Sequence, residues 1–211
     1  MGKFKQGILG SFSGKVGTVT GTYWKGIPVM KGNTVRKRSS MSEGQLQQQA
    51  KFKIAAQFVY TMKELLAFSF GRFANTMTGV NSALSYNLKN AVAGDYPDFS
   101  IDYSKALVSR GDLVNEGQVS ASAGTDQVVF TWTDTAGEGS SSASDRAVLV
   151  VYCEALKKAA YTVSEVSRSA GSATIQVPRF KGQVVQTWLA FKQAKGSEVS
   201  DSRYTGELTI A

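Results

Sequence analysis

The sequence has no histidine, a single cysteine and only three prolines among its 211 residues. Without histidine, the Ser-His-Asp and Cys-His forms of catalysis are excluded, and so are zinc sites that contain histidine. The lone Cys153 cannot form an internal disulfide or a thiolate cluster, and its apolar neighbours in the sequence favour a core position. The ligand spacing of an EF-hand is also missing. We therefore expect neither a metal ion nor a cofactor, and no catalytic residues.

Long apolar runs are missing as well. No run approaches the roughly 18 apolar residues that span a membrane, and the early run at Ile8 and Leu9 is too short and glycine-rich for a signal peptide. Gln6 stands where a myristoylation signal requires Ser or Thr. We expect a protein that is made in the cytoplasm and has no membrane partner. It either stays in the cytoplasm or leaves it within an assembly such as a virion.

Acidic residues are scarce at the amino terminus. Residues 1–53 hold ten basic residues and one acid, for a net charge of +9, whereas residues 54–211 hold fourteen basic and fifteen acidic residues, for −1. This asymmetry indicates an anionic partner, either nucleic acid or the acidic face of a protein, and the alternative is a solvated face that keeps the protein soluble. The candidate contact residues are Lys3, Lys5, Lys15, Tyr23, Trp24, Lys25, Lys31, Arg36, Lys37, Arg38, Lys51 and Lys53.

The same region is rich in glycine, and a phosphate-binding loop is the first hypothesis for it. A Walker A loop needs four residues between its glycines and Ser or Thr after the lysine. Here three residues separate Gly10 from Gly14, and Val16 follows Lys15. Two hypotheses remain. The segment contacts nucleic acid through lysines and aromatics, or it is an arm that adds a strand to a neighbouring sheet and anchors Trp24.

Three zones follow one another along the chain. Residues 1–40 predict a β-hairpin with strands at 16–24 and 27–31, because Thr, Val and aromatics flank a turn at Lys25 and Gly26. A capping box at Ser42 and Gln45 predicts the start of a helix. Apolar residues then recur at a helical period. They predict helices of about 25 and 20 residues, joined at Gly71 into an antiparallel hairpin whose apolar stripes face a core or a subunit interface.

The third zone has the pattern of an all-β domain. Short runs rich in Val, Ile and aromatic residues are separated by Gly, Ser and Asp turns, a spacing that predicts a β-sandwich of about seven or eight strands. Asp98 and Asp102 are four residues apart, a spacing that puts both on one face of a strand, and we interpret them as surface acids rather than a catalytic pair. The predicted strands span 101–109, 117–123, 127–133, 146–154, 160–167, 173–177, 184–193 and 203–210.

Two resemblances add to these predictions. The aromatic residues Trp132, Tyr152, Trp188 and Phe191 stand where a fibronectin type III domain has its core aromatics, so residues 99–211 resemble that immunoglobulin-like fold. The whole chain resembles a family catalogued as a domain of unknown function in bacteria and their phages. That resemblance rests on the Gly-Ile-Leu-Gly-Ser-Phe-Ser-Gly-Lys-Val-Gly start, the Trp-Lys-Gly after it and the Gln-rich helix start. It implies no activity.

Together these observations predict an α+β protein. We expect a docking unit at 1–97, made of a basic β-hairpin arm and a helical hairpin, and a fibronectin III-like β-sandwich at 98–211. The function we expect is structural rather than enzymatic: assembly with other copies of the chain or other virion proteins, in a phage or prophage particle. The alternative is a nucleic-acid-binding protein that uses the basic segment 3–53.

Overall fold

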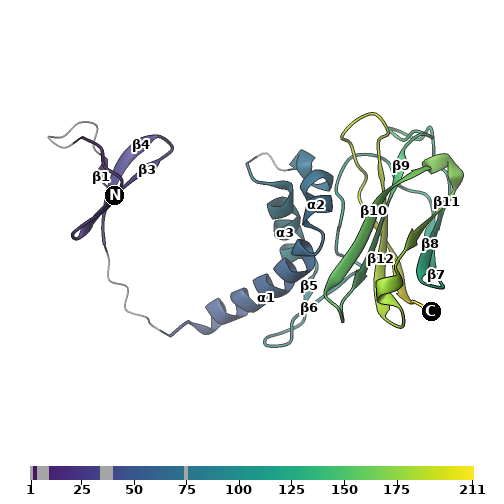
Figure 1. Cartoon of the computed structure of the whole chain (residues 1–211), viewed down its shortest axis with the longest axis horizontal. Coiled ribbons are helices and arrows are strands. Elements are labelled where there is room, and N and C mark those ends of the chain that lie inside the picture. The colour runs from purple at the N-terminus through teal and green to yellow at the C-terminus, as the bar shows by residue number, and fades with distance from the viewer. Residues whose placement is uncertain (1, 4–9, 34–39, 74–75) are drawn as a thin grey trace. The chain divides into compact units, whose positions relative to one another are not determined.

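The computed structural model of the chain describes residues 2–3, 10–33, 40–73 and 76–211. The chain divides into two compact units, Met1–Ser42 and Glu43–Ala211 (Figure 1). Helices occur only in the second unit among the described residues, and antiparallel sheets occur in both. The fold is therefore of the α+β class, as predicted.

The first unit is a small antiparallel sheet in the strand order β1-β4-β3-β2. Its strands are β1 (Gly2–Lys3), β2 (Gly14–Val16), β3 (Val19–Trp24) and β4 (Ile27–Gly32). The predicted hairpin is confirmed: Trp24 pairs with Ile27 across a two-residue turn. Lys25 and Gly26 both have positive φ, 49° and 76°, as a type I′ hairpin turn requires. Sequence reasoning missed β1 and β2, which widen the hairpin to four strands.

The helical part of the second unit contains more and shorter helices than predicted. Its helices are α1 (Glu43–Tyr60), α2 (Lys63–Ser69), the 3-10 helix η1 (Gly71–Phe73) and α3 (Gly79–Asn90). The expected first helix is interrupted after Tyr60, where the Thr61 hydroxyl donates a hydrogen bond of 2.7 Å to the Phe58 carbonyl. The last helix has 12 residues rather than about 20, because Thr78 caps its start by accepting from the Asn81 amide.

Seven strands form the predicted sandwich. One sheet has three strands in the order β11-β8-β7, and the other has four in the order β10-β9-β12-β13. Apolar side chains between the sheets, including those of Phe130, Leu149 and Phe191, form one core cluster. The strands are β7 (Val119–Gly124), β8 (Gln127–Trp132), β9 (Arg146–Cys153), β10 (Lys158–Ser167), β11 (Ser172–Gln176), β12 (Val184–Lys192) and β13 (Arg203–Thr209).

The first strand predicted for the sandwich, at 101–109, is wrong except at its start. Only β6 (Ser100–Ile101) is extended, and it pairs with β5 (Val92–Ala93) outside the sandwich. The chain then turns, because the Asp102 carbonyl accepts hydrogen bonds from the amides of Lys105 and Ala106. The alternating apolar residues after this turn are buried in an irregular segment rather than in a strand.

A second core cluster joins the helices to the outer face of the four-stranded sheet. It contains Phe58 and Met62 from the helical part and Val150, Tyr152 and Trp188 from the sheet, all of them buried. Strand β9 is therefore buried on both of its faces, since its alternate side chains fill the two clusters. We expected a boundary between residues 97 and 98. The two compact units divide the chain between residues 42 and 43, and the helices share a core cluster with the sheet.

Candidate docking surface

The net charge follows the division into compact units. Eight of the 24 basic residues and none of the 16 acidic residues lie in Met1–Ser42. That unit therefore carries the full formal charge of +8. Glu43–Ala211 holds 16 residues of each sign and is neutral. A small unit of one charge sign attracts anionic partners more strongly than the same charges spread over the chain.

The tip of the β3–β4 hairpin exposes three large apolar side chains within a few residues of one another. Trp24 is 57% exposed, Tyr23 51% and Ile27 38%. Trp24 and Ile27 are a directly opposed pair, so their side chains leave the sheet on the same face. The ammonium of Lys25 lies 5.4 Å from the centre of the Trp24 ring, within cation–π range. The tip thus combines an exposed aromatic surface with positive charge.

Two more lysines lie on the Trp24 face. Lys15 pairs with Thr20 across β2 and β3, and Thr20 pairs with Lys31 across β3 and β4. Because side chains alternate along a strand, Thr20 and Trp24 point to the same side of the sheet. The exposed residues Lys15 and Lys31 therefore flank Thr20 on the face that carries Trp24 and Ile27 at its other end.

On the opposite face, a glycine in β3 allows another part of the glycine-rich stretch to pack closely on the sheet. Gly21 is buried in the middle of β3, and a β-carbon added there would lie 2.3 Å from the carbonyl oxygen of Phe12 and 2.7 Å from its ring. The Ser11 and Tyr23 hydroxyls lie 2.5 Å apart, within hydrogen-bonding distance. The absence of a side chain at Gly21 thus lets the Phe12 segment pack directly on the strand.

The structure divides the predicted contact residues. It places Lys15, Trp24 and Lys31 on one face of the sheet in the first unit and Lys25 in the adjoining turn, whereas Tyr23 points to the opposite face. Ile27 is a neighbour of Trp24 that sequence reasoning did not single out. The sequence could have indicated that Ile27 lies at the hairpin tip, since this residue directly follows the predicted turn.

Of the remaining predicted contacts, two lie in the second unit, one lies in β1, and four fall outside the described residues. Lys51 and Lys53 lie on α1 in the second unit, where the Lys51 ammonium is 4.9 Å from the centre of the Phe99 ring. Lys3 lies in β1, at the register position opposite Val29. Lys5, Arg36, Lys37 and Arg38 fall outside the described residues.

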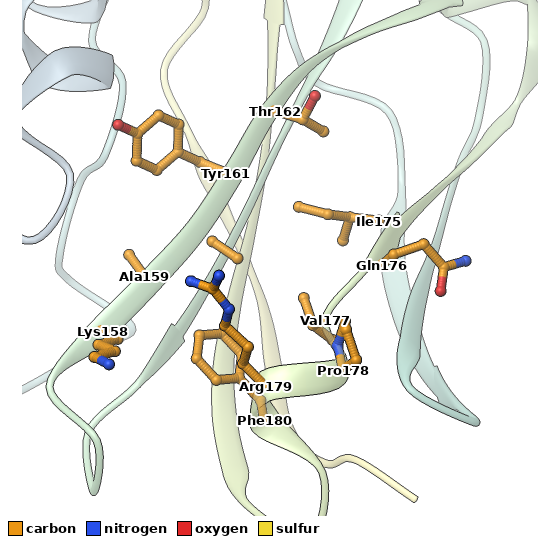
Figure 2. Close-up of a pocket in the computed structure, with 11 residues that line it drawn as sticks. Lys158, Ala159, Tyr161, Thr162, Ile175, Gln176, Val177, Pro178, Arg179 and Phe180 are labelled. Atoms are coloured by element: carbon orange, nitrogen blue, oxygen red, sulfur yellow. The ribbon is translucent and has the colours of Figure 1, made fainter.

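A groove of about 500 Å³ lies in the second unit, between β10 and a wall formed by the end of β11 and the segment that follows it (Figure 2). Its apolar lining includes Ile175, Val177 and Phe180, and its charged lining residues are Lys158 and Arg179. The second half of the segment is the 3-10 helix η3 (Pro178–Phe180). Sequence reasoning missed this groove, because it forms between edge strands of two different sheets, which no local pattern reveals.

A family model matches residues 11–206 of the chain, and its description reads "Family of unknown function (DUF6266)". The chain belongs to this family. The membership confirms the resemblance seen in the sequence, and the matched region covers both the hairpin tip and the groove. A comparison with curated proteins gives no match.

The perturbed titratable groups in this DUF6266 chain belong to its packing. Burial between helices and sheet raises the pKa of Tyr152 to about 12, and burial likewise raises the pKa of Tyr103. The described ranges contain no group of three or more His, Cys, Asp or Glu placed to hold a metal ion. Across the same ranges, no helix has both the length and the hydrophobicity needed to cross a membrane.

Proposed function

We propose that the chain is a non-enzymatic structural protein whose first unit, Met1–Ser42, docks onto an acidic surface of a partner protein. The single observation that carries this proposal is the concentration of the whole net charge in a unit that also exposes Trp24, Tyr23 and Ile27. The second unit, neutral and larger, is the body that this docking attaches to the partner.

The composition of the hairpin tip supports a protein partner. Tryptophan and tyrosine are the residues most enriched at energetic hot spots of protein interfaces. Here they lie next to Lys25 and on a sheet that carries Lys15 and Lys31 without any acid nearby in the sequence. The lysines would steer an acidic partner toward the site, and burial of the Trp24 ring would supply most of the affinity. Docking within a virion is a narrower form of the same proposal.

Photocrosslinking from the hairpin tip tests the proposal. A benzophenone amino acid replaces Trp24 in one variant and Val184 in a control variant, since Val184 is also exposed but lies at the start of β12 in the second unit. We expect adducts with one or a few acidic proteins from position 24 and not from position 184. Identical adducts from both positions, or none from position 24, would contradict the proposal.

Nucleic acid is the second candidate partner, and the arrangement of Lys15, Thr20 and Lys31 favours it. Lys15 and Lys31 flank Thr20 on the face that carries the exposed Trp24 ring. Proteins that bind single-stranded nucleic acid combine cations that neutralise the phosphate backbone with aromatic rings that stack on the bases. Fluorescence anisotropy with a labelled single-stranded oligonucleotide separates the candidates. Nucleic-acid binding would weaken steeply with salt and further in K15E/K31E. The docking proposal expects no specific complex with the oligonucleotide at physiological salt.

A further inference from the structure

The groove beside β10 combines three features of a peptide-binding site: a free strand edge, an apolar floor and a charged rim of one sign. It lies within the second unit and does not involve the hairpin tip. Binding in this groove is therefore independent of the docking function proposed for the first unit.

Strand β10 is an edge strand of the four-stranded sheet. In the sheet order it pairs with β9 alone, so the backbone groups on its other side have no strand partner among the described residues. The ladder is regular from Lys158 to Val163 and becomes irregular only between Val163 and Ser167. Bulges, prolines, charged side chains and very short strands are the usual protections of an edge. In the regular part of β10 the only one of these is the charged side chain of Lys158, at the start of the strand.

Both edges of the four-stranded sheet contact the three-stranded sheet, but to different extents. The contact of β13 with β7 is more extensive than the contact of β10 with β11. On the β10 side the space between the sheets widens into the groove, whose lining runs from Lys158 to Thr162 on β10 and from Ile175 to Phe180 on the other wall. The free edge and the groove therefore coincide.

The groove has an apolar floor and a basic rim. Ile175, Val177 and Phe180 are buried beneath it, whereas Lys158 and Arg179 are exposed. Figure 2 shows the Arg179 side chain extending from η3 toward β10. No acid lines the groove, so its charge complements carboxylates and disfavours the basic first unit of another copy.

We propose that this groove binds an extended peptide segment of a partner protein, which pairs with the free edge of β10 at Lys158–Val163. Alternate side chains of the peptide, small and β-branched, would face Ile175, Val177 and Phe180. Carboxylate side chains at one end would meet Lys158 and Arg179. This is strand addition, in which backbone hydrogen bonds give affinity and the alternate side chains and charges give specificity.

A peptide array provides the test. It holds seven-residue peptides that alternate Val with Ser or Thr, each in one series with Glu residues at one end and in a matched series with Lys there. We expect the acidic series to bind the full-length chain about tenfold more tightly than the basic series. Hydrogen exchange in the complex should slow at the amides of 158–163. Equal binding of both series, no binding by either, or slowed exchange elsewhere would overturn the proposal.

Charge reversal supplies the matched variants. K158E/R179E changes two exposed residues of the rim and should reverse the preference between the two series. K89E/K195E makes the same change at exposed residues outside the groove and should leave the preference intact. W24A should also bind the acidic peptides normally, so that failure of hairpin docking and failure of this proposal are distinguishable. Self-association of the chain through paired β10 edges, detected by sedimentation, would contradict the proposal.

Discussion

The ring of Phe58 on α1 meets the ring of Tyr152 on β9 edge-on, with the ring centres 5.1 Å apart and the ring planes at 90°. This contact lies in the cluster that joins helices to sheet, and both side chains are buried. It is one of the contacts through which the helices and the sheet share a core.

Truncation of Phe58 should therefore destabilise the whole second unit. We expect F58A to lower the free energy of unfolding by about 3–5 kcal/mol, because it leaves a cavity in the core. Denaturant unfolding followed by circular dichroism and by fluorescence should show coincident transitions for helices and strands. The control is F52A on the same helix, since Phe52 is 48% exposed and should change stability by no more than about 0.5 kcal/mol. Separate transitions would contradict a shared core.

The buried ion pair in the sandwich predicts strong coupling between its members. The Arg168 Nε lies 3.3 Å from an Asp145 carboxylate oxygen, both side chains are almost fully buried, and the Arg168 guanidinium stacks 3.9 Å from the centre of the Phe191 ring. We expect R168M to cost about 3–5 kcal/mol, because it strands a buried carboxylate. D145N/R168M should cost less than the two single changes summed.

The exposed pair of Arg146 and Glu165 is the control for this cycle. Glu165 is open to solvent, and screening limits such pairs, so E165A should cost less than about 1 kcal/mol. Denaturant unfolding of all four variants measures these differences. Strict additivity of D145N and R168M would contradict a coupled pair.

The turn at Asp102 predicts an acid-sensitive contribution to stability. Lys105 and Ser104 hold the ionised carboxylate by hydrogen bonds, which lowers the pKa of Asp102 from 3.8 to about 2. Because the folded state favours the ionised carboxylate, the lowered pKa stabilises the folded state at pH values above the ordinary pKa of the group. This stabilisation is lost as the pH falls and the carboxylate is protonated. The stability advantage of the wild type over D102N should therefore be constant above about pH 5 and shrink between about pH 5 and 1. Unfolding curves over that range measure it, and an advantage that grows on acidification would rule the account out.

The close approach at Gly21 predicts that the first unit tolerates no side chain there. G21A should displace the Phe12 segment, because the added carbon would meet a backbone carbonyl oxygen at 2.3 Å. We expect a loss of about 1–3 kcal/mol, as in other overpacked sites. Chemical shifts of the first unit report the displacement. G32A is the control, since a β-carbon at Gly32 meets nothing within 4 Å. Equal spectra for the two variants would contradict the packing.

The sequence predicted elements whose signals are local. The β3–β4 hairpin followed from the turn residues Lys25 and Gly26, and the strands of the sandwich followed from short β-branched runs between turns. The start of α1 also lies where the capping box placed it, directly after Ser42. Each of these features is encoded within a few neighbouring residues.

The errors arose where side chains or distant contacts override the local pattern. The apolar stripe through Phe58 and Met62 continues across the helix break, so the periodicity gives no sign of the interruption. The break occurs where the Thr61 hydroxyl donates a hydrogen bond to the Phe58 carbonyl. The alternation after Ile101 resembles a strand, but Asp102 folds the chain into a turn. The groove between β10 and β11 and the coverage of Gly21 by Phe12 depend on tertiary packing, which periodicity does not encode.

Titration calorimetry with the partner captured at position 24 measures how much the hairpin tip contributes to docking. Truncation of an aromatic hot spot typically costs at least about 2 kcal/mol, so W24A should bind about 30-fold more weakly than the wild type. K15E/K31E should bind more weakly as well, and added salt should reduce the difference. F52A, which removes an exposed aromatic ring from the second unit, should bind as the wild type does. If W24A keeps full affinity, or if F52A loses as much as W24A, the first unit is not the docking surface.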